Sequence, residues 1–275
     1  MKIKSCHTIC IANQKGGVGK STSSALLADG LVLEGYKVLL IDLDSQGNAS
    51  LNVGADPNKP TIYDALMKRL NAQEAVQLRT HEHAHDVGSR VERASIIPSG
   101  SKLANIDLEL MNTGKEYRLK ELLIPLRSMF DYIVLDTPPA LGVVTINAMT
   151  AANSLIIPAH ADVFSLQGIG QLKETIDAVH EYTNKELIVA GIILTRHNAR
   201  TVLGRDMTEV ARETAKRIGT FLYKTVIRES VVIREAQAKQ QSVYDYAPRS
   251  NSAYDYREFV NEFLNKVGCS HEKEI

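Results

Sequence analysis

The stretch KGGVGKST occupies residues 15–22 and follows the apolar run CHTICIA of residues 6–12. It places three glycines and two lysines within six positions, and the next residues, SSALLADGLVLEG (23–35), have a helical pattern. A glycine-rich loop between a strand and a helix lets backbone N–H groups converge on phosphate oxygens, because no Cβ blocks the approach and several positions need positive φ. The stretch therefore predicts a phosphate-binding loop.

The residues of this loop have separate expected roles. Lys20 supplies a positive charge to the β- and γ-phosphates of a nucleotide, and the Ser21 hydroxyl is a natural Mg²⁺ ligand. The common P-loop pattern is G-x-x-x-x-G-K-[ST], whereas Gln14 occupies the first glycine position here and Lys15 stands beside it. The nucleotide-binding residues that we expect are Gly16, Gly17, Val18, Gly19, Lys20, Ser21 and Thr22.

Short apolar runs alternate with longer helical patterns along the rest of the chain. The further strands that we expect are KVLLIDLD (37–44), YIVLDTP (132–138), SLIIPA (154–159) and ELIVAGIILT (186–195). Runs that are apolar at nearly every position are typical of strands buried on both faces, as in a parallel sheet covered by helices. The sequence predicts an α/β fold with a mostly parallel central sheet and helices on both faces, in one domain of residues 1–275.

Helices are expected at residues 101–111, 165–181 and 203–218. A closing helix has one apolar stripe at helical spacing, formed by Tyr256, Phe259, Val260, Phe263, Leu264 and Val267. Residues 71–93 are polar and poorly periodic, and we expect a helix followed by a surface loop there. His81, His83 and His85 in this region suggest a metal site, but their polar, turn-like surroundings and the lack of a fourth ligand favour an ordinary surface loop.

Composition restricts the classes of partner and the compartment. Thirty-two basic residues balance 32 acidic ones, so attraction to nucleic acid or acidic lipid requires a local patch. Cys6, Cys10 and Cys269 form no C-x-x-C pair, which argues against a disulfide framework and against a zinc or iron–sulfur site. We expect a cytoplasmic protein, since the N-terminus lacks a signal-peptide pattern and no run approaches the roughly 20 apolar residues of a membrane span.

Two acidic motifs end apolar strands. In VLLIDLDSQGNAS (38–50), Asp42 and Asp44 are two residues apart, so both are expected on the same face at the carboxyl end of a strand, where ligands of open α/β sheets bind. Asp44 is expected to orient or activate the attacking water, and Asp42 to support the Mg²⁺ shell. Asp136 ends the strand of residues 132–136 and is expected to hold Mg²⁺ directly or through water. The predicted metal site is Ser21, Asp42 and Asp136.

These motifs resemble those of one family. KGGVGKST resembles the deviant Walker A loop of the ParA/MinD ATPases, and the preceding Asn13 and Gln14 are similar to the ParA (Soj) branch. DxDxQGNxS resembles the ParA switch motif, with Asp44 at the position required for hydrolysis, and DYIVLDTPPALG resembles a Walker B strand. Ser45 departs from the pattern, since proline is usual there, and the change is expected to alter loop stiffness and not chemistry.

The resemblance spans nearly the whole chain and implies a P-loop NTPase fold, an ATPase activity, and ATP and Mg²⁺ as cofactors. It also implies a role for the second lysine: Lys15 reaches across a dimer interface to the phosphates of the partner's nucleotide, so that Lys15, Lys20 and Asp44 are the catalytic residues of an ATP-bound homodimer. The alternative is that Lys15 is an ordinary solvated charge. These motifs hold no arginine finger, which implies slow turnover stimulated by a partner.

A local basic segment predicts binding to double-stranded DNA without base specificity. Residues 196–239 hold ten Lys or Arg and five Asp or Glu, a net charge of +5. The expected contacts are Arg200, Arg228 and Arg234. Arg200 lies in ARTVLG, which resembles a DNA-binding arginine of short chromosomal ParA proteins, whereas Val232 occupies the position of the second family arginine. The alternative is ordinary solvated helices.

The resemblance implies a partition ATPase that is cytoplasmic and nucleoid-associated, binds DNA as an ATP dimer, and is released by a ParB-like adaptor. An N-terminal helix-turn-helix domain is not expected, because the P-loop begins within the first 20 residues. One alternative is a MinD-like positioning ATPase on a membrane or a protein scaffold, but acidic residues in the closing helix argue against membrane binding. A second alternative, a metabolic P-loop ligase, is disfavoured by the presence of Lys15. A third, an ATPase of the nitrogenase iron-protein type, is disfavoured because Cys6 and Cys10 lie in the first expected strand without suitable partner cysteines.

Overall fold

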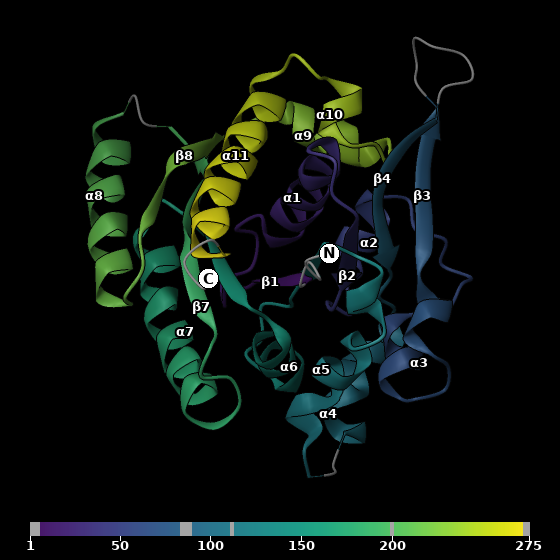
Figure 1. Ribbon diagram of the computed structural model, residues 1–275. Helices are drawn as coiled ribbons and strands as arrows, with labels where there is room; N and C mark the ends of the chain where they lie inside the picture. The colour runs from purple at the N-terminus through teal and green to yellow at the C-terminus, as the bar shows by residue number, and fades with distance from the viewer. Residues whose placement is uncertain (1–5, 83–89, 111–112, 199–200, 272–275) are drawn as a thin grey trace.

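A single sheet organises the described part of the chain, which comprises residues 6–82, 90–110, 113–198 and 201–271 of a computed structural model (Figure 1). Its strands, in the order β3-β4-β2-β5-β1-β6-β7-β8, are parallel except for the antiparallel pair β3 and β4. Their bounds are β1 His7–Ile11, β2 Val38–Asp42, β3 Gln77–Glu82, β4 Arg90–Ile97, β5 Tyr132–Asp136, β6 Ser154–His160, β7 Ile188–His197 and β8 Leu222–Arg228.

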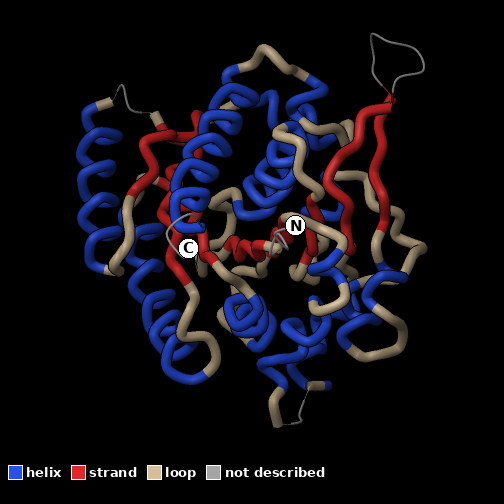
Figure 2. The backbone as a smooth tube through the Cα atoms, viewed as in Figure 1, coloured by secondary structure: helices blue, strands red, loops and turns tan. Residues whose placement is uncertain are grey.

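Helices cover both faces of this sheet (Figure 2). In the view of Figure 1, α1 and α9–α11 lie above β1 and α4–α6 lie below it. The α-helices are α1 Lys20–Leu33, α2 Asn48–Asn52, α3 Ile62–Leu66, α4 Ile106–Glu109, α5 Arg118–Leu123, α6 Val143–Ala151, α7 Val163–Tyr182, α8 Val202–Arg217, α9 Val231–Ala238, α10 Val243–Tyr246 and α11 Asn251–His271. The 3₁₀ turns are η1 Ala72–Ala75, η2 Ser101–Asn105, η3 Lys115–Tyr117 and η4 Leu126–Ser128.

The alternation of strand side chains gives each face its own hydrophobic core. Ile9 of β1 lies in the core under α1 and α11, whereas the next residue, Cys10, lies in the core under α6 and α7. Both side chains are fully buried, as expected for a strand covered on both faces. The predicted α/β fold is thus confirmed, and the P-loop follows a central strand.

The expected strands at residues 37–44, 132–138, 154–159 and 186–195 are present as β2, β5, β6 and β7. The helices expected at 165–181 and 203–218 are α7 and α8. The helix expected at 101–111 is instead a 3₁₀ turn followed by the short helix α4, which ends at Glu109.

The expectation of a helix followed by a surface loop at residues 71–93 missed the strands β3 and β4, which follow the 3₁₀ turn η1. Residues 83–89, between the two strands, lie outside the described residues. The strands were not predicted because they contain arginines, and these arginines are buried in ion pairs with carboxylates. Arg79 Nη1 lies 3.1 Å from Asp29 Oδ1, and Arg93 pairs with Asp245. The three histidines of the suggested loop give no test of that prediction, since His83 and His85 lie outside the described residues and nothing is described of the His81 side chain.

The closing helix α11 packs on the protein's own core, as its apolar stripe predicted. Phe259 and Phe263 are fully buried, and α11 contacts both α1 and β8. Gly30 permits the close approach of α1, since a Cβ there would lie 2.6 Å from Val260 Cγ2. Among the described residues, no helix combines the length and the apolar character needed to cross a bilayer.

Carboxylates of α11 accept hydrogen bonds from backbone N–H groups of β8, the strand at one edge of the sheet. Glu262 accepts hydrogen bonds from the backbone N–H groups of Lys224 and Thr225 on β8, and Asp255 accepts one from Arg228 N–H at 3.0 Å. An edge strand otherwise presents unpaired donors to other chains. The acidic residues that argued against membrane binding are therefore structural in this fold.

Candidate functional site

The P-loop joins β1 to α1 with two glycines in the left-handed region. Gly17 has φ 77° and Gly19 has φ 82°, conformations that favour glycine, and α1 begins at Lys20. Thr195 fixes the loop from outside, since its Oγ1 donates to the Val18 carbonyl at 2.8 Å. Asn13, at the start of the loop, also stabilises its conformation, because the Asn13 Oδ1 accepts a hydrogen bond from Lys15 N–H at 3.0 Å. Thr195, at the end of the predicted strand of residues 186–195, was not among the predicted site residues.

Lys20 is held inside the loop. Its side chain is buried, and Nζ donates to the Lys15 carbonyl at 3.2 Å. Burial lowers the pKa of Lys20, and the charges of Asp136 and Asp44 oppose this shift. The first turn of α1 contains no acidic residue, so its unpaired N–H groups and the ammonium create a site of positive potential. This arrangement binds a phosphate chain.

Two carboxylates meet at the carboxyl edge of the sheet beside the loop. Asp42 and Asp136 are direct partners in the register of β2 and β5, and both are fully buried. Asp42 Oδ2 accepts from Ser50 N–H at 2.8 Å and from Ser50 Oγ at 2.7 Å. Asp136 Oδ1 accepts from Ser24 Oγ at 2.9 Å, whereas its Oδ2 is buried without a hydrogen-bond partner among the described residues.

This pair fits a divalent cation. Burial raises the pKa of both Asp42 and Asp136, and the Asp42 charge raises that of Asp136 further. The Ser21 hydroxyl lowers the pKa of Asp136 in part, which places it beside that carboxylate. Adjacent buried carboxylates need a compensating positive charge, and an unpartnered oxygen is the ligand that Mg²⁺ prefers. The three predicted metal residues are thus brought together.

Asp44 lies just beyond β2 in the loop that leads to α2. Its side chain is 7% exposed, and Oδ1 accepts from Gln46 N–H at 3.0 Å. The Asp44 backbone N–H in turn donates to Asp42 Oδ1 at 3.0 Å, so the Asp42 carboxylate holds the backbone of Asp44. The short turn closed by Gly47 N–H on the Asp44 carbonyl fixes the backbone of this loop. Asp44 therefore lies at the phosphate side of the site with a defined orientation.

Lys15 pairs with an acidic residue of its own chain. Its Nζ lies 2.8 Å and 2.9 Å from the two carboxylate oxygens of Asp162, and the two side chains are 32% and 37% exposed. Asp162 also caps α7 by accepting from Ser165 N–H at 2.8 Å. Asp162 was not among the predicted site residues.

Comparisons with known proteins agree with this geometry. A family pattern described as "AAA domain" matches residues 6–189. The chain is 37% identical over 257 residues to "Sporulation initiation inhibitor protein Soj" of Bacillus subtilis, covering 92% of this chain and 96% of that protein. It is 32% identical to "Chromosome partitioning protein ParA" of Caulobacter vibrioides, covering 97% of each. The chain belongs to the ParA/MinD family of ATPases.

A solved structure from Mycobacterium smegmatis has a similar fold. It is named cobyrinic acid a,c-diamide synthase with bound ATP analogue and magnesium. It shares 30% sequence identity with this ParA-type ATPase, has a TM-score of 0.77, and the match covers 93% of each chain. The P-loop NTPase fold is therefore shown, and the ATPase assignment follows from the family.

A pocket of about 80 Å³ adjoins the P-loop of this ParA-type ATPase. Gly19 and Thr22 of the phosphate-binding loop line it, and we call it the nucleotide pocket for that reason. Arg196 at its rim has φ 49°, which is uncommon for a residue with a side chain. The remaining lining residues are Thr195, Ile227, Arg228, Glu229, Ser230, Ile233, Arg234, Gln237 and Tyr256.

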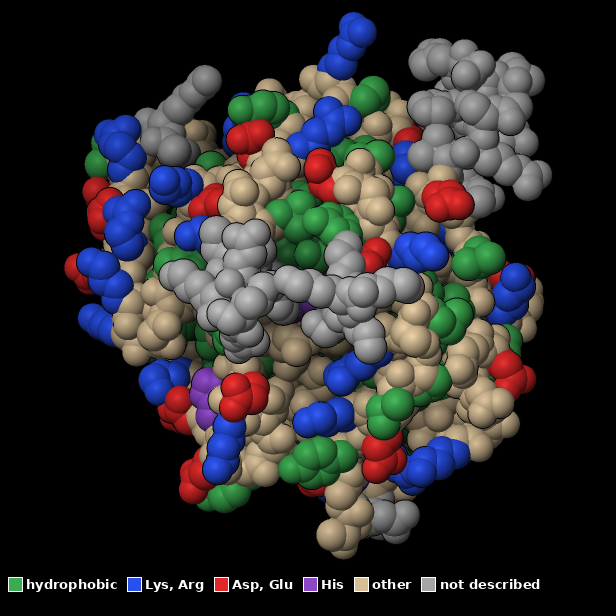
Figure 3. Space-filling model, in the orientation of Figure 1, with side chains coloured by type: hydrophobic (Ala, Val, Ile, Leu, Met, Phe, Trp, Pro, Cys, Tyr) green, Lys and Arg blue, Asp and Glu red, His purple; other side chains and the backbone are tan. Residues whose placement is uncertain are grey.

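The predicted DNA contacts of this ATPase differ in their surroundings. Arg234 is exposed on α9. Arg228 Nη2 lies 2.6 Å from Asp255 Oδ1, and the Arg228 side chain is 44% exposed. Arg200 lies outside the described residues. Figure 3 shows Lys and Arg side chains along the α8 side of one face, with Asp and Glu among them.

Arg228→Ala is expected to destabilise the protein, because it leaves the 5%-exposed Asp255 without its cation. We expect a loss of about 1–2 kcal/mol, reduced by the solvent around Arg228, and a fall in Tm of about 3–5 °C in thermal unfolding. Lys173→Ala removes an exposed ion pair with Asp177 and serves as the control, with an unchanged Tm. Equal Tm values for the two variants would contradict a structural role of Arg228.

Proposed function

We propose that the chain is a DNA partition ATPase. Two copies close over ATP and Mg²⁺, bind double-stranded DNA without base specificity, and separate after hydrolysis stimulated by a ParB-like adaptor. The observation that carries this proposal is the pair of lysines in the P-loop. Lys20 is buried in the loop, whereas Lys15 is partly exposed and bound to Asp162. A loop with one internal and one surface ammonium group suits a nucleotide shared between two subunits.

Each site residue has a defined role in this proposal. The N–H groups of the loop and the Lys20 ammonium bind the phosphates. Mg²⁺, when bound by Ser21, Asp42 and Asp136, neutralises phosphate charge. Asp44 orients the attacking water. Lys15 exchanges Asp162 for the partner's phosphates when the dimer forms, so that dimerisation depends on the γ-phosphate.

DNA binding in this proposal uses the basic segment of residues 196–239. Arg234 is the described candidate with the clearest access to DNA, since it is exposed on a helix that borders the nucleotide pocket. Dimerisation doubles the basic surface and makes retention steeply dependent on salt. The same proposal includes a plasmid, an integrative element or a chromosomal region as cargo. It also includes a cytoplasmic and nucleoid-associated location and a single ATPase domain.

Arg234→Ala is expected to weaken DNA retention in ATP at every salt concentration and to reduce the salt slope by about one. The ATP-dependent dimer is expected to remain, because Arg234 makes no hydrogen bond or ion pair to the phosphate-binding loop within the described part of the chain. Retention is measured on non-specific DNA over a salt series, and dimerisation by mass measurement. The control Lys173→Ala removes one positive charge from α7 and is expected to leave both readouts unchanged. A normal salt slope for Arg234→Ala would move the DNA surface elsewhere.

The overall proposal is tested with the wild-type protein in ATP, ADP and no nucleotide. We expect a dimer and DNA retention in ATP alone. A protein that remains monomeric with a non-hydrolysable ATP analogue contradicts the proposed switch. Binding to lipid vesicles and not to DNA would support the MinD-like alternative. Turnover that requires a small carboxylic-acid metabolite would support the ligase alternative suggested by the name of the M. smegmatis structure.

A further inference from the structure

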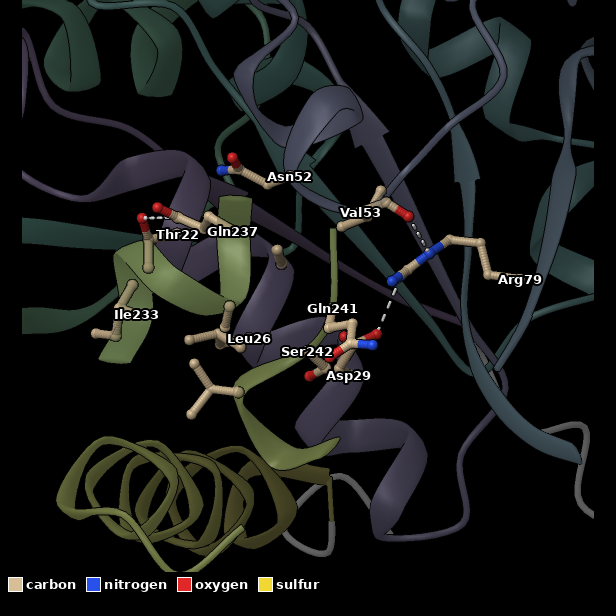
Figure 4. Close-up of a pocket in the computed structure, with 13 residues that line it drawn as sticks. Thr22, Leu26, Asp29, Asn52, Val53, Arg79, Ile233, Gln237, Gln241 and Ser242 are labelled. Atoms are coloured by element: carbon tan, nitrogen blue, oxygen red, sulfur yellow. Dashed lines mark hydrogen bonds and ion pairs between the residues drawn. The ribbon is translucent and has the colours of Figure 1, made fainter. Parts of the chain in front are cut away.

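One hydrogen bond joins the P-loop helix to the short helix α9, although their sequences are far apart. Gln237 Nε2 donates to Thr22 Oγ1 at 3.0 Å, across a sequence separation of 215 residues. Figure 4 shows the two side chains pointing toward one another between α1 and α9. Both residues line the nucleotide pocket beside the P-loop and also a second pocket next to Asp29 and Ser242. The bond therefore forms a wall between the two pockets.

The direction of this hydrogen bond determines what the Thr22 hydroxyl can do next. An amide nitrogen only donates, so the Thr22 oxygen accepts, and the hydroxyl keeps its own hydrogen for another acceptor. We find no acceptor for that hydrogen in the described part of the chain. Thr22 is the third residue of α1, where the backbone N–H also lacks a partner within the helix. The Thr22 hydroxyl and the Thr22 backbone N–H are therefore both available to bind an anion at the N-terminus of α1.

The other end of α9 contacts the loop region that follows Asp44. Gln240, just beyond α9, packs against Gly54, close enough that a Cβ on Gly54 would lie 3.4 Å from the Gln240 Cβ. Gly54 follows α2, and α2 packs against α9. Helix α9 therefore contacts the P-loop helix through Gln237 and the segment after the Asp44 loop through Gln240.

We propose that Gln237 is a positioning residue: it holds the Thr22 hydroxyl toward the nucleotide phosphates and thereby links the occupancy of the P-loop to the placement of α9 and its exposed Arg234. The part that concerns Arg234 rests on the proposed DNA-binding function. Arg234 and Gln237 are one helical turn apart and line the same pocket, so a shift of the Gln237 side chain moves the backbone that carries Arg234. ATP binding and DNA binding are coupled through this contact.

A double-mutant cycle tests the first part of the inference. Gln237→Met keeps the length of the side chain but removes the donor, and Thr22→Val removes the hydroxyl. Each is expected to weaken ATP binding about fivefold, the value of one hydrogen bond. The double variant is expected to bind no more weakly than Thr22→Val alone, because the two residues act through one hydroxyl. Additive losses would overturn the positioning role.

Gln237→Glu separates positioning from a merely structural contact. A carboxylate accepts the Thr22 hydrogen and withholds it from phosphate, so this nearly isosteric variant is expected to bind ATP more weakly than Gln237→Met. Gln241→Met, which changes an exposed glutamine beyond the end of α9, is the matched control and is expected to behave as wild type. Thermal unfolding of every variant checks the fold. ATP affinities of both Gln237 variants equal to wild type would overturn the inference.

DNA retention at saturating ATP tests the second part. Gln237→Met is expected to lower retention about threefold or more even when every site is filled, since one lost hydrogen bond weakens the link between α9 and the P-loop. Full retention by this variant would overturn the coupling to Arg234. If the wild-type protein itself shows no DNA retention in ATP, the proposed partition function fails, and the ATP-affinity cycle still decides the role of Gln237.

Discussion

Replacement of Lys20 by alanine is expected to abolish nucleotide binding at ordinary concentrations, with a loss of ATP affinity of about 100-fold, or roughly 3 kcal/mol. The side chain is 7% exposed and its Nζ lies inside the loop. Solvent therefore screens its interaction with phosphate far less than that of a surface lysine. The buried ammonium has also lost part of its hydration, as its lowered pKa indicates, so binding of phosphate removes little further water. Titration calorimetry with ATP and Mg²⁺ measures the loss.

Controls distinguish loss of the phosphate ligand from loss of the fold. Lys20→Ala is expected to unfold at a temperature close to that of wild type, because the relieved desolvation cost of the buried ammonium offsets its lost attraction to Asp136 and Asp44. Lys173→Ala, which removes a surface lysine from α7, is expected to bind ATP normally. Undiminished ATP affinity in Lys20→Ala would refute the assignment of residues 15–22 as the phosphate-binding loop.

The central strands and the P-loop were predictable because their signals are local. A strand buried on both faces is expected to be apolar at nearly every position, and β2 and β5 satisfy this rule up to their final aspartate. The loop requires glycine at positive φ, which Gly17 and Gly19 supply within the motif itself. The meeting of Asp42 with Asp136 followed from a further rule, since carboxyl ends of neighbouring parallel strands share one edge.

The hairpin of β3 and β4 was not predictable from local pattern. Its arginines lie in the interior, where a sequence reading expects apolar residues, and their partners are distant in the chain. Arg79 pairs with Asp29, which is 50 residues away, and Arg93 pairs with Asp245, which is 152 residues away. A buried charge is tolerated only when it is paired, and the pairing appears only in three dimensions. The same reason concealed the ion pair of Lys15 with Asp162, which are 147 residues apart.

The charge of residues 196–239 does not show which of their arginines is available to bind DNA, and Arg228 is an example. The net charge of +5 for residues 196–239 includes this arginine, but its guanidinium binds Asp255 of α11. Because the guanidinium is paired with this buried carboxylate, Arg228 adds less to the basic surface than the count suggests. The sequence alone does not distinguish Arg228 from Arg234, because the distinction depends on which side of β8 and α9 faces α11.

Asp44→Ala is expected to lower the rate of ATP hydrolysis by at least about 100-fold while leaving ATP affinity within a factor of a few, because a positioned carboxylate acts on the attacking water and not on the bound phosphates. The Asp44 residue is 7% exposed, its backbone N–H donates to Asp42, and its carboxylate accepts from Gln46 N–H, so the carboxylate is already oriented for this role. The charge of Asp44 raises the pKa of the nearby Lys20, which places the carboxylate close to the ammonium expected to bind the phosphates.

The consequence for assembly is a trapped species. Under the proposed function, Asp44→Ala is expected to accumulate as an ATP-bound dimer that stays on DNA, whereas wild type dissociates as ATP is consumed. Phosphate release, mass measurement and DNA retention over time are read on the same sample. Asp56→Ala, which alters an acidic residue in the loop after α2, is the control and is expected to hydrolyse ATP normally. Wild-type hydrolysis by Asp44→Ala would remove Asp44 from the catalytic site, whereas slow hydrolysis without a persistent dimer would retain its role in hydrolysis and refute the link between hydrolysis and release.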